Sequence, residues 1–297
     1  MVLELDHLSK RYGGTEALRD LTLHVPAGSV YGLLGPNGSG KTTTLGIALG
    51  VLNPSGGTVR WFGQALSAGS KRRVGALLET PNFYPYLSAR QNLQVAAEVK
   101  RADARRIDEV LETVGLLGRQ HDAFQSFSLG MKQRLALAST LLGQPEVLVL
   151  DEPTNGLDPQ GIAEVRTLVQ RLAAEGKTII LASHLLDEIE KVCTHVAVLQ
   201  RGQLRAAGPV RDILTSADRV VLRPGPATTP AALTQALARL PWVSDVQAEA
   251  DGCLSAVLTS EQHPAALNEA LFSQGIILAG LELRHRSLET QFLALTS

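Results

Sequence analysis

A glycine-rich segment between an apolar run and a helical segment is the feature that most constrains how this chain can fold. Residues 35–43 read GPNGSGKTT and fit the spacing G-x-x-x-x-G-K-S/T. The apolar residues Val30–Leu34 before it predict a strand, and Lys41–Gly50 after it predict a helix. Backbone N–H groups of such a loop, together with the positive end of the helix, hold phosphate groups. The candidate nucleotide-binding residues are Gly35, Pro36, Asn37, Gly38, Ser39, Gly40, Lys41, Thr42 and Thr43.

Short apolar runs alternate with helical segments over the first two thirds of the chain. Fully apolar strands such as Val147–Leu150 are typical of a parallel sheet that is buried on both faces. This alternation predicts an α/β fold. Further strands are expected at Val2–Leu5, Thr58–Phe62, Val74–Leu78, Thr178–Ala182 and Val196–Leu199. Further helices are expected at Ala104–Val114, Lys132–Leu142, Ile162–Glu175 and Asp187–Val192.

The length of 297 residues and a change of pattern after Leu214 favour two domains. In the second part we expect strands at 219–223, 243–249, 254–259 and 277–285, and helices at 230–239, 264–273 and 287–295. The first six of these follow the order βαββαβ, which predicts a ferredoxin-like fold. We assign 1–214 to a nucleotide-binding α/β domain and 215–297 to an accessory α+β domain.

Composition excludes several classes of protein. The net charge of −1 argues against a general electrostatic grip on nucleic acid, so no nucleic acid is expected as a partner. The two cysteines, Cys193 and Cys253, are far apart, which excludes a disulfide framework and favours a reducing compartment. No run approaches the roughly 18 apolar residues of a membrane span, and the first residues lack the apolar core of a secretion signal.

Two carboxylates and a histidine directly follow predicted buried strands. Asp151 and Glu152 follow one apolar run, and His184 comes shortly after another. Because ligands bind at the carboxyl ends of parallel strands, we expect these side chains to lie beside the phosphate loop. From spacing alone, His184 could hydrogen-bond the γ-phosphate or Glu152, or it could be a structural histidine.

These residues have the chemistry that phosphoryl transfer to water requires. Lys41 is expected to neutralise phosphate charge, and Thr42 and Asp151 are candidate ligands of Mg²⁺. Glu152 is expected to polarise the water that attacks the γ-phosphate. The alternative for the acidic pair is two solvated carboxylates that cap a helix.

Further motifs give the chain a family resemblance. Residues 127–134 read FSLGMKQR just ahead of the acidic strand, and residues 155–158 read NGLD after it. With the phosphate loop, this order resembles the ATP-binding subunit of an ABC transporter over about residues 2–214. In this resemblance the first segment is the signature loop and the second the D-loop. Tyr12 matches the aromatic residue that stacks on adenine, and His184 matches the switch histidine.

The resemblance implies two such domains in a head-to-tail dimer that encloses two ATP molecules with Mg²⁺. Ser128 and Gly130 would contact the γ-phosphate bound to the other subunit, and Asp158 would join the nucleotide site. A second copy of this chain is the expected partner. Hydrolysis would then depend on closure of the dimer.

The chain departs from the family pattern at two places. In the signature loop, Leu129 replaces a glycine and Met131 replaces a glutamine, a form that resembles exporters of drugs and peptide antibiotics. After the strand Val74–Leu78, Glu79 stands where the family usually has a glutamine. We expect Glu79 to be a third contact of Mg²⁺ or its water, the alternative being a side chain that points to solvent.

The resemblance also implies a separate membrane permease. Phe83, Tyr84 and Tyr86 lie in the region that borders the permease groove in the family, and clustered aromatics suit a protein interface. An internal cluster is the alternative for these rings. We therefore expect an exporter ATPase bound peripherally at the cytoplasmic face of the membrane. The alternative function is a soluble, non-transport ABC ATPase acting on ribosomes or nucleic acid, which typically carries tandem domains or long insertions that this chain lacks.

Overall fold

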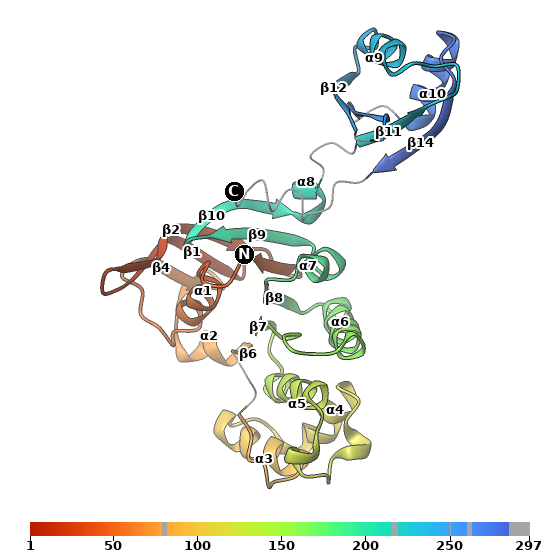
Figure 1. Ribbon diagram of the computed structural model, residues 1–297. Coiled ribbons are helices and arrows are strands. Elements are labelled where there is room, and N and C mark those ends of the chain that lie inside the picture. Colours follow the sequence, from red (N-terminus) through yellow and green to blue (C-terminus); the bar gives the residue numbers. More distant parts are fainter. Residues whose placement is uncertain (79–81, 215–218, 250, 260–262, 285–297) are drawn as a thin grey trace. The chain divides into compact units, whose positions relative to one another are not determined.

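The computed structural model describes residues 1–297 except 79–81, 215–218, 250, 260–262 and 285–297. The chain forms two compact units, Met1–Val210 (unit 1) and Arg211–Ser297 (unit 2), which are described separately (Figure 1). Glu79 and the helix expected at 287–295 lie outside the described residues.

Unit 1 contains two sheets. An antiparallel sheet has the order β2-β1-β4-β5, and a six-stranded sheet has the order β10-β9-β3-β8-β7-β6. In the larger sheet β3 runs parallel to β8 and β9, β7 runs parallel to β6 and β8, and β10 is antiparallel to β9. The strands are β1 Leu3–Tyr12, β2 Thr15–Val25, β3 Val30–Leu34, β4 Gly56–Trp61, β5 Gln64–Ala65, β6 Val74–Leu77, β7 Val147–Asp151, β8 Thr178–Ser183, β9 His195–Gln200 and β10 Gln203–Pro209.

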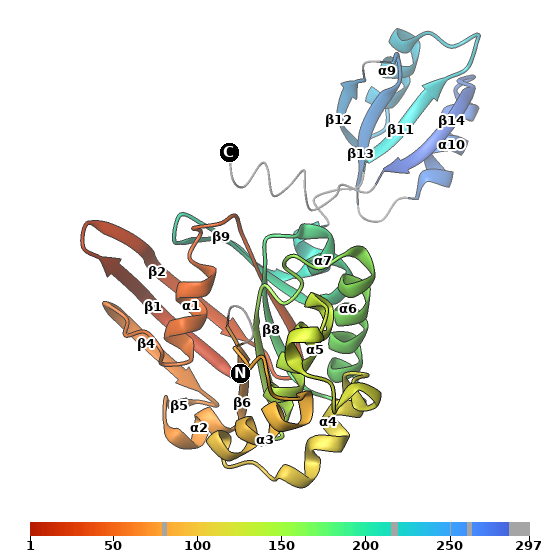
Figure 2. The same cartoon turned by 60° about the horizontal axis from the view of Figure 1, so that its bottom comes forward.

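Helices cover both faces of the six-stranded sheet. α1 lies between the two sheets, and α5, α6 and α7 lie on the opposite face (Figure 2). The α-helices of unit 1 are α1 Lys41–Ala48, α2 Ala68–Arg72, α3 Ala89–Lys100, α4 Ile107–Thr113, α5 Leu129–Leu141, α6 Pro159–Ala174 and α7 Leu186–Val192, and α8 Val210–Leu214 begins at its last residue. Short 3₁₀ turns occur at Ala104–Arg106, Leu117–Arg119 and Phe124–Ser126.

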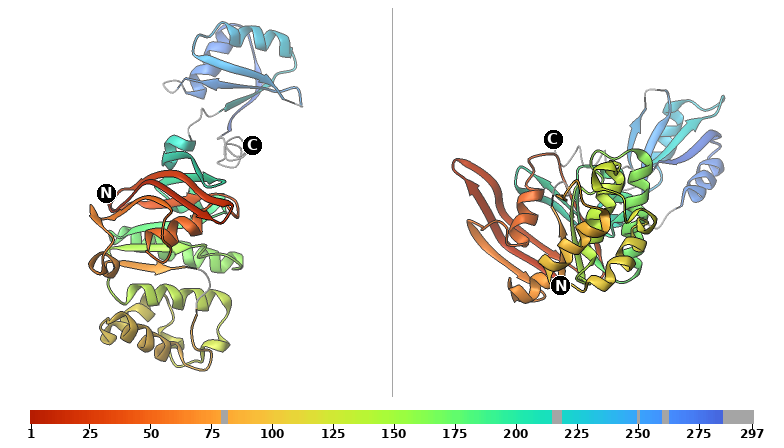
Figure 3. Two further views of the ribbon diagram at one scale, coloured as in Figure 1. Left: turned by 90° about the vertical axis from the view of Figure 1, so that its left-hand side faces the viewer. Right: turned by 90° about the horizontal axis from the view of Figure 1, so that it is seen from below.

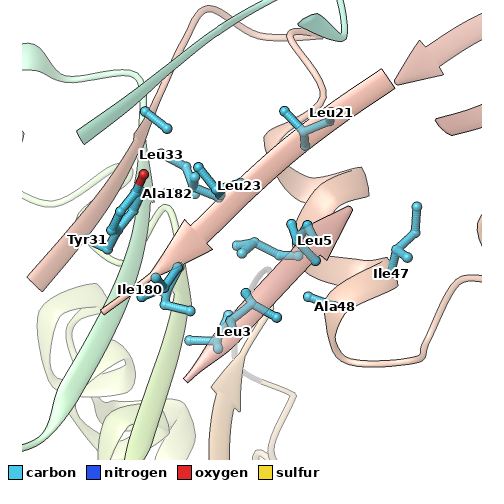
Figure 4. Packing of buried hydrophobic residues seen from close by; sticks show 14 of the residues in the cluster. Leu3, Leu5, Leu21, Leu23, Tyr31, Leu33, Ile47, Ala48, Ile180 and Ala182 are labelled. Carbon is cyan, nitrogen blue, oxygen red and sulfur yellow. The ribbon is translucent and has the colours of Figure 1, made fainter. Parts of the chain in front are cut away.

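The core of unit 1 forms where α1 is enclosed by the two sheets. Ile47 and Ala48 of α1 pack with Leu5 of β1 and with Ile180 and Ala182 of β8, and all five are fully or almost fully buried (Figure 4). Burial of aliphatic side chains of this kind stabilises the fold by roughly 1.5–3 kcal/mol each. The packing fixes α1 between the two sheets, and therefore fixes the loop that leads into α1.

A helical region lies apart from the antiparallel sheet. α3, α4 and the beginning of α5 gather at the far end of unit 1 (Figures 1 and 3). Arg134 of α5 donates to the carbonyl of Val114 at the end of α4 over 3.0 Å. The signature loop therefore belongs to this helical region.

The predicted α/β pattern is confirmed, with corrections at several elements. β2, β5 and β10 and the helices α2, α3 and α8 were not predicted, and β1 runs to Tyr12 rather than ending at Leu5. The expected helix Ala104–Val114 is a 3₁₀ turn followed by α4. α5 starts at Leu129, three residues before the expected start at Lys132, because Ser128 caps it: the Ser128 hydroxyl accepts from the backbone N–H of Met131 over 3.2 Å.

Unit 2 has the element order that the sequence predicts for its described part. The antiparallel sheet has the order β12-β13-β11-β14. Leu222, Leu237 and Leu271 from β11 and the two helices form its buried centre. The elements are β11 Arg219–Pro224, α9 Pro230–Ala238, β12 Val243–Ala248, β13 Leu254–Leu258, α10 Pro264–Ser273 and β14 Leu278–Arg284.

Candidate nucleotide site

Strand register brings three functional segments to one edge of the six-stranded sheet. Leu34 at the end of β3 is level with Ser183 at the end of β8, and Asp151 at the end of β7 is level with Ala182. The phosphate loop, the acidic pair and His184 therefore start side by side. This juxtaposition was predicted from the buried strands.

The phosphate loop needs glycine at specific positions. Gly38 and Gly40 have φ angles of 78° and 105°, which L side chains rarely adopt. A Cβ atom on Gly40 would also lie 2.6 Å from the Leu18 side chain and 2.9 Å from the Ala17 carbonyl. The loop is thus shaped by its contact with β2, a strand that the sequence analysis missed.

Lys41 is buried in the loop that it follows. Its Nζ atom donates to the carbonyl of Gly35 over 2.7 Å and to that of Pro36 over 3.4 Å. The same Nζ atom lies 3.3 Å from Glu152 Oε1. The lysine therefore places a positive charge between the phosphate loop and the acidic pair.

Glu152 also contacts His184. The Nδ1 atom of His184 lies 2.8 Å from Glu152 Oε2, and because a carboxylate only accepts, the imidazole donates. The backbone N–H of Glu152 donates to the Ala182 carbonyl over 2.9 Å, and the residue has a φ of 47°. This backbone conformation directs the side chain toward Lys41 and His184 together. A hydrogen bond between His184 and Glu152 is one of the alternatives that spacing alone allows, and it is present in the structure.

A cavity of about 520 Å³ opens beside the loop. Seven residues of the predicted phosphate loop line it together with Glu152, and five lining residues were not predicted. The predicted loop residues that line the cavity are Asn37, Gly38, Ser39, Gly40, Lys41, Thr42 and Thr43. Gly35 and Pro36 do not line it, and their carbonyl groups accept hydrogen bonds from Lys41 instead. The unpredicted ones are Thr15, Glu16, Ala17, Arg19 and Arg201. They were missed because the β1–β2 hairpin and the turn before β10 were not expected.

The cavity suits a bound anion and a cation beside it. Arg19, Lys41 and Arg201 line its wall together with Glu16 and Glu152. The buried Ser39 Oγ has no hydrogen-bond partner among the described residues. Thr42 is exposed to the cavity, whereas Asp151 is 4% exposed at the end of β7. A hydroxyl and a carboxylate are ligands that Mg²⁺ accepts, so these residues fit that ion.

The residues of the signature loop and the D-loop do not line this cavity. Ser128 is exposed and caps α5, and Gly130 lies in the first turn of that helix. Asp158 caps α6, where its Oδ1 atom accepts from the backbone N–H of Gly161 over 2.9 Å. Within the described part of the chain, Ser128 and Asp158 thus each cap a helix of their own subunit.

The predicted aromatic residues differ in exposure. Tyr12 is 48% exposed and lies under Lys10, whose Nζ atom is 4.8 Å from the ring centroid. Tyr84 and Tyr86 are 50% and 72% exposed. Phe83 is half-buried and packs edge-on against Phe124, with ring centroids 5.2 Å apart. Two of the three clustered rings are therefore available to a partner, and the third anchors the segment.

Fold and site together define a P-loop protein whose carboxylate, histidine and lysine converge on one phosphate loop. Residues 18–155 match the ABC transporter family. Over 304 residues the chain is 40% identical to the uncharacterised ABC transporter ATP-binding protein YhcH of Bacillus subtilis, and the match covers 99% of this chain and 96% of that protein. The chain therefore belongs to the family of ABC transporter ATP-binding proteins, which are ATPases.

Two further similarities refine this assignment. The chain is 44% identical over 208 residues to the bacitracin transport ATP-binding protein BcrA of Bacillus licheniformis, which covers 68% of each chain. Among solved structures, CbiO1 of Clostridium perfringens, part of the ABC transporter complex cbiONQ, is similar with a TM-score of 0.65 and 27% identity, over 81% of this chain and 96% of that one. The fold of unit 1 is accordingly the ABC-type P-loop fold. In the described residues, no helix is both long and apolar enough to cross a membrane.

Proposed function

We propose that this protein is the motor subunit of an exporter of peptide antibiotics or drugs. The proposed class of transport substrate rests on the 44% identity to a bacitracin transport ATP-binding protein. The proposed role as an ATP-hydrolysing motor rests on the convergence of Lys41, Glu152 and His184 on the phosphate loop. A separate permease would hold the cargo pathway, and this subunit would sit at its cytoplasmic face.

In the proposed mechanism, the loop N–H groups and Lys41 bind the β- and γ-phosphates of ATP. Glu152 accepts a proton from the attacking water, and His184 keeps the carboxylate oriented through its 2.8 Å contact. Thr42 and Asp151 would hold Mg²⁺, which neutralises phosphate charge when bound. Tyr12 would stack on the adenine ring. Glu79, which lies outside the described residues, stays a candidate metal contact.

The remaining site residues would act across a dimer. Ser128 uses its oxygen to accept from Met131, so its own O–H remains able to donate to a phosphate. Gly130 and the N-terminal turn of α5 present backbone N–H groups to the same anion. In a head-to-tail dimer of two copies, Ser128, Gly130 and Asp158 of one subunit would complete the site of the other. ATP binding would close this dimer, and hydrolysis would reopen it.

Two assignments concern partners and domains. We propose that the exposed Tyr84 and Tyr86 contact the permease, with Phe83 as their anchor.

We also propose that residues 1–214 are the nucleotide-binding domain and that 215–297 are a ferredoxin-like accessory domain. The antiparallel order β12-β13-β11-β14 supports that class.

Antibiotic sensitivity of the source organism tests the export function. Deletion of this gene is expected to sensitise cells to bacitracin or to a lantibiotic, and the wild-type copy is expected to restore resistance. A copy with Lys41→Ala is expected to fail, since the loop lacks its cation. Unchanged sensitivity to both classes of antibiotic after deletion would contradict the proposed cargo, and rescue by the Lys41→Ala copy would contradict the motor role.

A further inference from the structure

A buried carboxyl group lies beside the proposed hydrolysis site without belonging to it. Glu188 is the fourth residue after His184, on α7, and is only 6% exposed. Its Oε2 atom accepts a 2.6 Å hydrogen bond from the Oγ1 atom of Thr154, which is also buried. Its Oε1 atom has no hydrogen-bond partner in the described part of the chain. Burial of an acid with one partner is costly, so its presence calls for a reason.

The Thr154–Glu188 hydrogen bond joins the two segments that carry the proposed catalytic pair. Thr154 lies two residues after Glu152, in the loop that follows β7, whereas Glu188 lies on the helix that follows His184. No other side-chain hydrogen bond in the described residues joins α7 to this loop. The bond is therefore placed to set the distance between the two segments.

The other side of α7 is fixed by apolar packing. Ile189 lies so close to β3 that a Cβ atom on Gly32 would be 2.8 Å from its Cδ1 atom. Cys193 packs against the same glycine. Helix α7 is thus held to the sheet by apolar contacts and, among the described residues, to the loop after β7 by one side-chain hydrogen bond.

The electrostatics agree with this placement. Burial raises the pKa of the Glu188 carboxyl above its ordinary value, and the charges of Asp187 and Glu152 act in the same direction. The hydrogen bond from Thr154 and the charge of Arg166 oppose this increase. The effect of Glu152 means that the two carboxyl groups are within electrostatic reach of each other.

We infer that Glu188 is a positioning residue that acts through Thr154 to hold Glu152 and His184 at hydrogen-bond distance. The inference rests on the proposed roles of that pair in hydrolysis. Without the bond, the loop after β7 and helix α7 can separate, and the carboxylate is no longer fixed against the imidazole. A misplacement of 1 Å can cost on the order of 100-fold in rate, so we expect kcat to fall by about tenfold or more.

Thr154→Val is the sharpest single test, because it keeps the shape of the side chain and removes its hydroxyl. In the full-length chain we expect kcat for ATP hydrolysis to fall by about tenfold, with KM changed by no more than about twofold. Thr154→Ser retains the hydroxyl and is expected to retain kcat. Thr140→Val is the matched control, since Thr140 is equally buried but bonds only to the Leu137 carbonyl of its own helix.

A second pair of variants guards against loss of folding. Glu188→Gln keeps an oxygen that can accept from Thr154, and its kcat is expected to equal that of wild type. Glu188→Met removes the acceptor, and its kcat is expected to fall. The folded fraction is measured by the stoichiometry of binding of a fluorescent ATP analogue. If Glu188→Met lowers only the folded fraction, and kcat per binding site equals that of wild type, the positioning role is overturned.

Combination with Glu152→Gln separates this inference from the proposed function. We expect Thr154→Val to lower kcat in the wild-type background and to have no further effect in the Glu152→Gln background. If Glu152→Gln alone hydrolyses ATP like wild type, the proposed function fails. If Glu152→Gln is inactive while Thr154→Val alone is fully active, the positioning role fails and the proposed function stands.

Discussion

The phosphate loop and the signature loop are both glycine-containing turns that lead into a helix, but their glycines differ in environment. A Cβ atom on Gly40 would clash with Leu18 and Ala17, and the residue has a φ of 105°. A Cβ atom on Gly130 would meet nothing closer than the Cα atom of Gly161, at 3.9 Å, and Gly130 lies within helix α5. The fold of this chain requires the first glycine and does not require the second.

This difference indicates whether each glycine is needed for a contact within its own chain or for a contact with something outside it. Gly40 is required because β2 and the loop approach each other within one chain. Gly130 leaves open space at the start of α5, a helix in which alanine would be favoured by up to about 1 kcal/mol. A glycine that its own chain does not need is consistent with close approach of something from outside. In our account this is the phosphate bound to the second subunit.

The largest expected effect is loss of hydrolysis on the phosphate-loop side. Glu152→Gln removes the proposed general base, and we expect a loss of at least about 100-fold in kcat with ATP binding retained. Glu190→Gln is the control, because Glu190 is an exposed acid on the neighbouring helix. Steady-state phosphate release and equilibrium binding of ATP measure the two quantities. Hydrolysis within about twofold of wild type in Glu152→Gln would remove the proposed base from the mechanism.

The next effect is a difference in the free energy of unfolding between alanine variants of Gly40 and Gly130. Gly40→Ala forces a strained backbone and a steric clash, and we expect the free energy of unfolding to fall by about 2 kcal/mol or more. Nucleotide binding should weaken with it. Chemical denaturation followed by circular dichroism gives the free energy of unfolding. An unchanged midpoint would show that the close approach of the loop to β2 is not a feature of the folded protein.

Gly130→Ala is expected to keep its stability and to lose ATPase activity, in contrast to Gly40→Ala, which is expected to lose stability. Its free energy of unfolding should be equal to that of wild type or slightly higher, because alanine favours the helix. Its ATPase activity should fall by about tenfold, since the added methyl group hinders approach of the phosphate from the partner. If stability falls and activity is retained, the comparison between the two loops is wrong.

The smallest effect concerns the adenine. Tyr12→Ala should raise KM for ATP by about fivefold with little change in kcat, because stacking of a base on an exposed ring contributes roughly 1 kcal/mol. Tyr86→Ala, at a still more exposed tyrosine, is the control for the loss of a surface ring. Equal KM values for the two variants would exclude Tyr12 from the nucleotide site.

The elements that the sequence predicted best are those with a single dominant signal. Val147–Leu150 and Thr178–Ala182 are continuous apolar runs, and each became a buried strand extended by one residue. The glycine spacing identified the phosphate loop, and its flanks placed Glu152 and His184 beside it. The contact between those two side chains depends on the backbone of Glu152 at a φ of 47°, which no pattern encodes.

The elements that were missed have weaker or mixed signals. β2 carries register shifts against β1 and half-exposed positions, which blur its alternation. Helix α3 is only half apolar, but Ser88 and Gln91 form a capping box at its start, a signal present in the sequence. Arg19 and Arg201 could not be placed in the site, because the hairpin and the turn that carry them were not predicted.

Complementation between two impaired variants tests most directly the claim that one subunit completes the site of the other. Lys41→Ala damages the phosphate loop, and Gly130→Ala damages the signature loop. In a head-to-tail dimer, a mixed pair contains one site with both elements intact, whereas neither homodimer contains any. We predict that a mixture of the two purified variants hydrolyses ATP well above the sum of the separate activities. A mixture no more active than that sum would contradict the shared site.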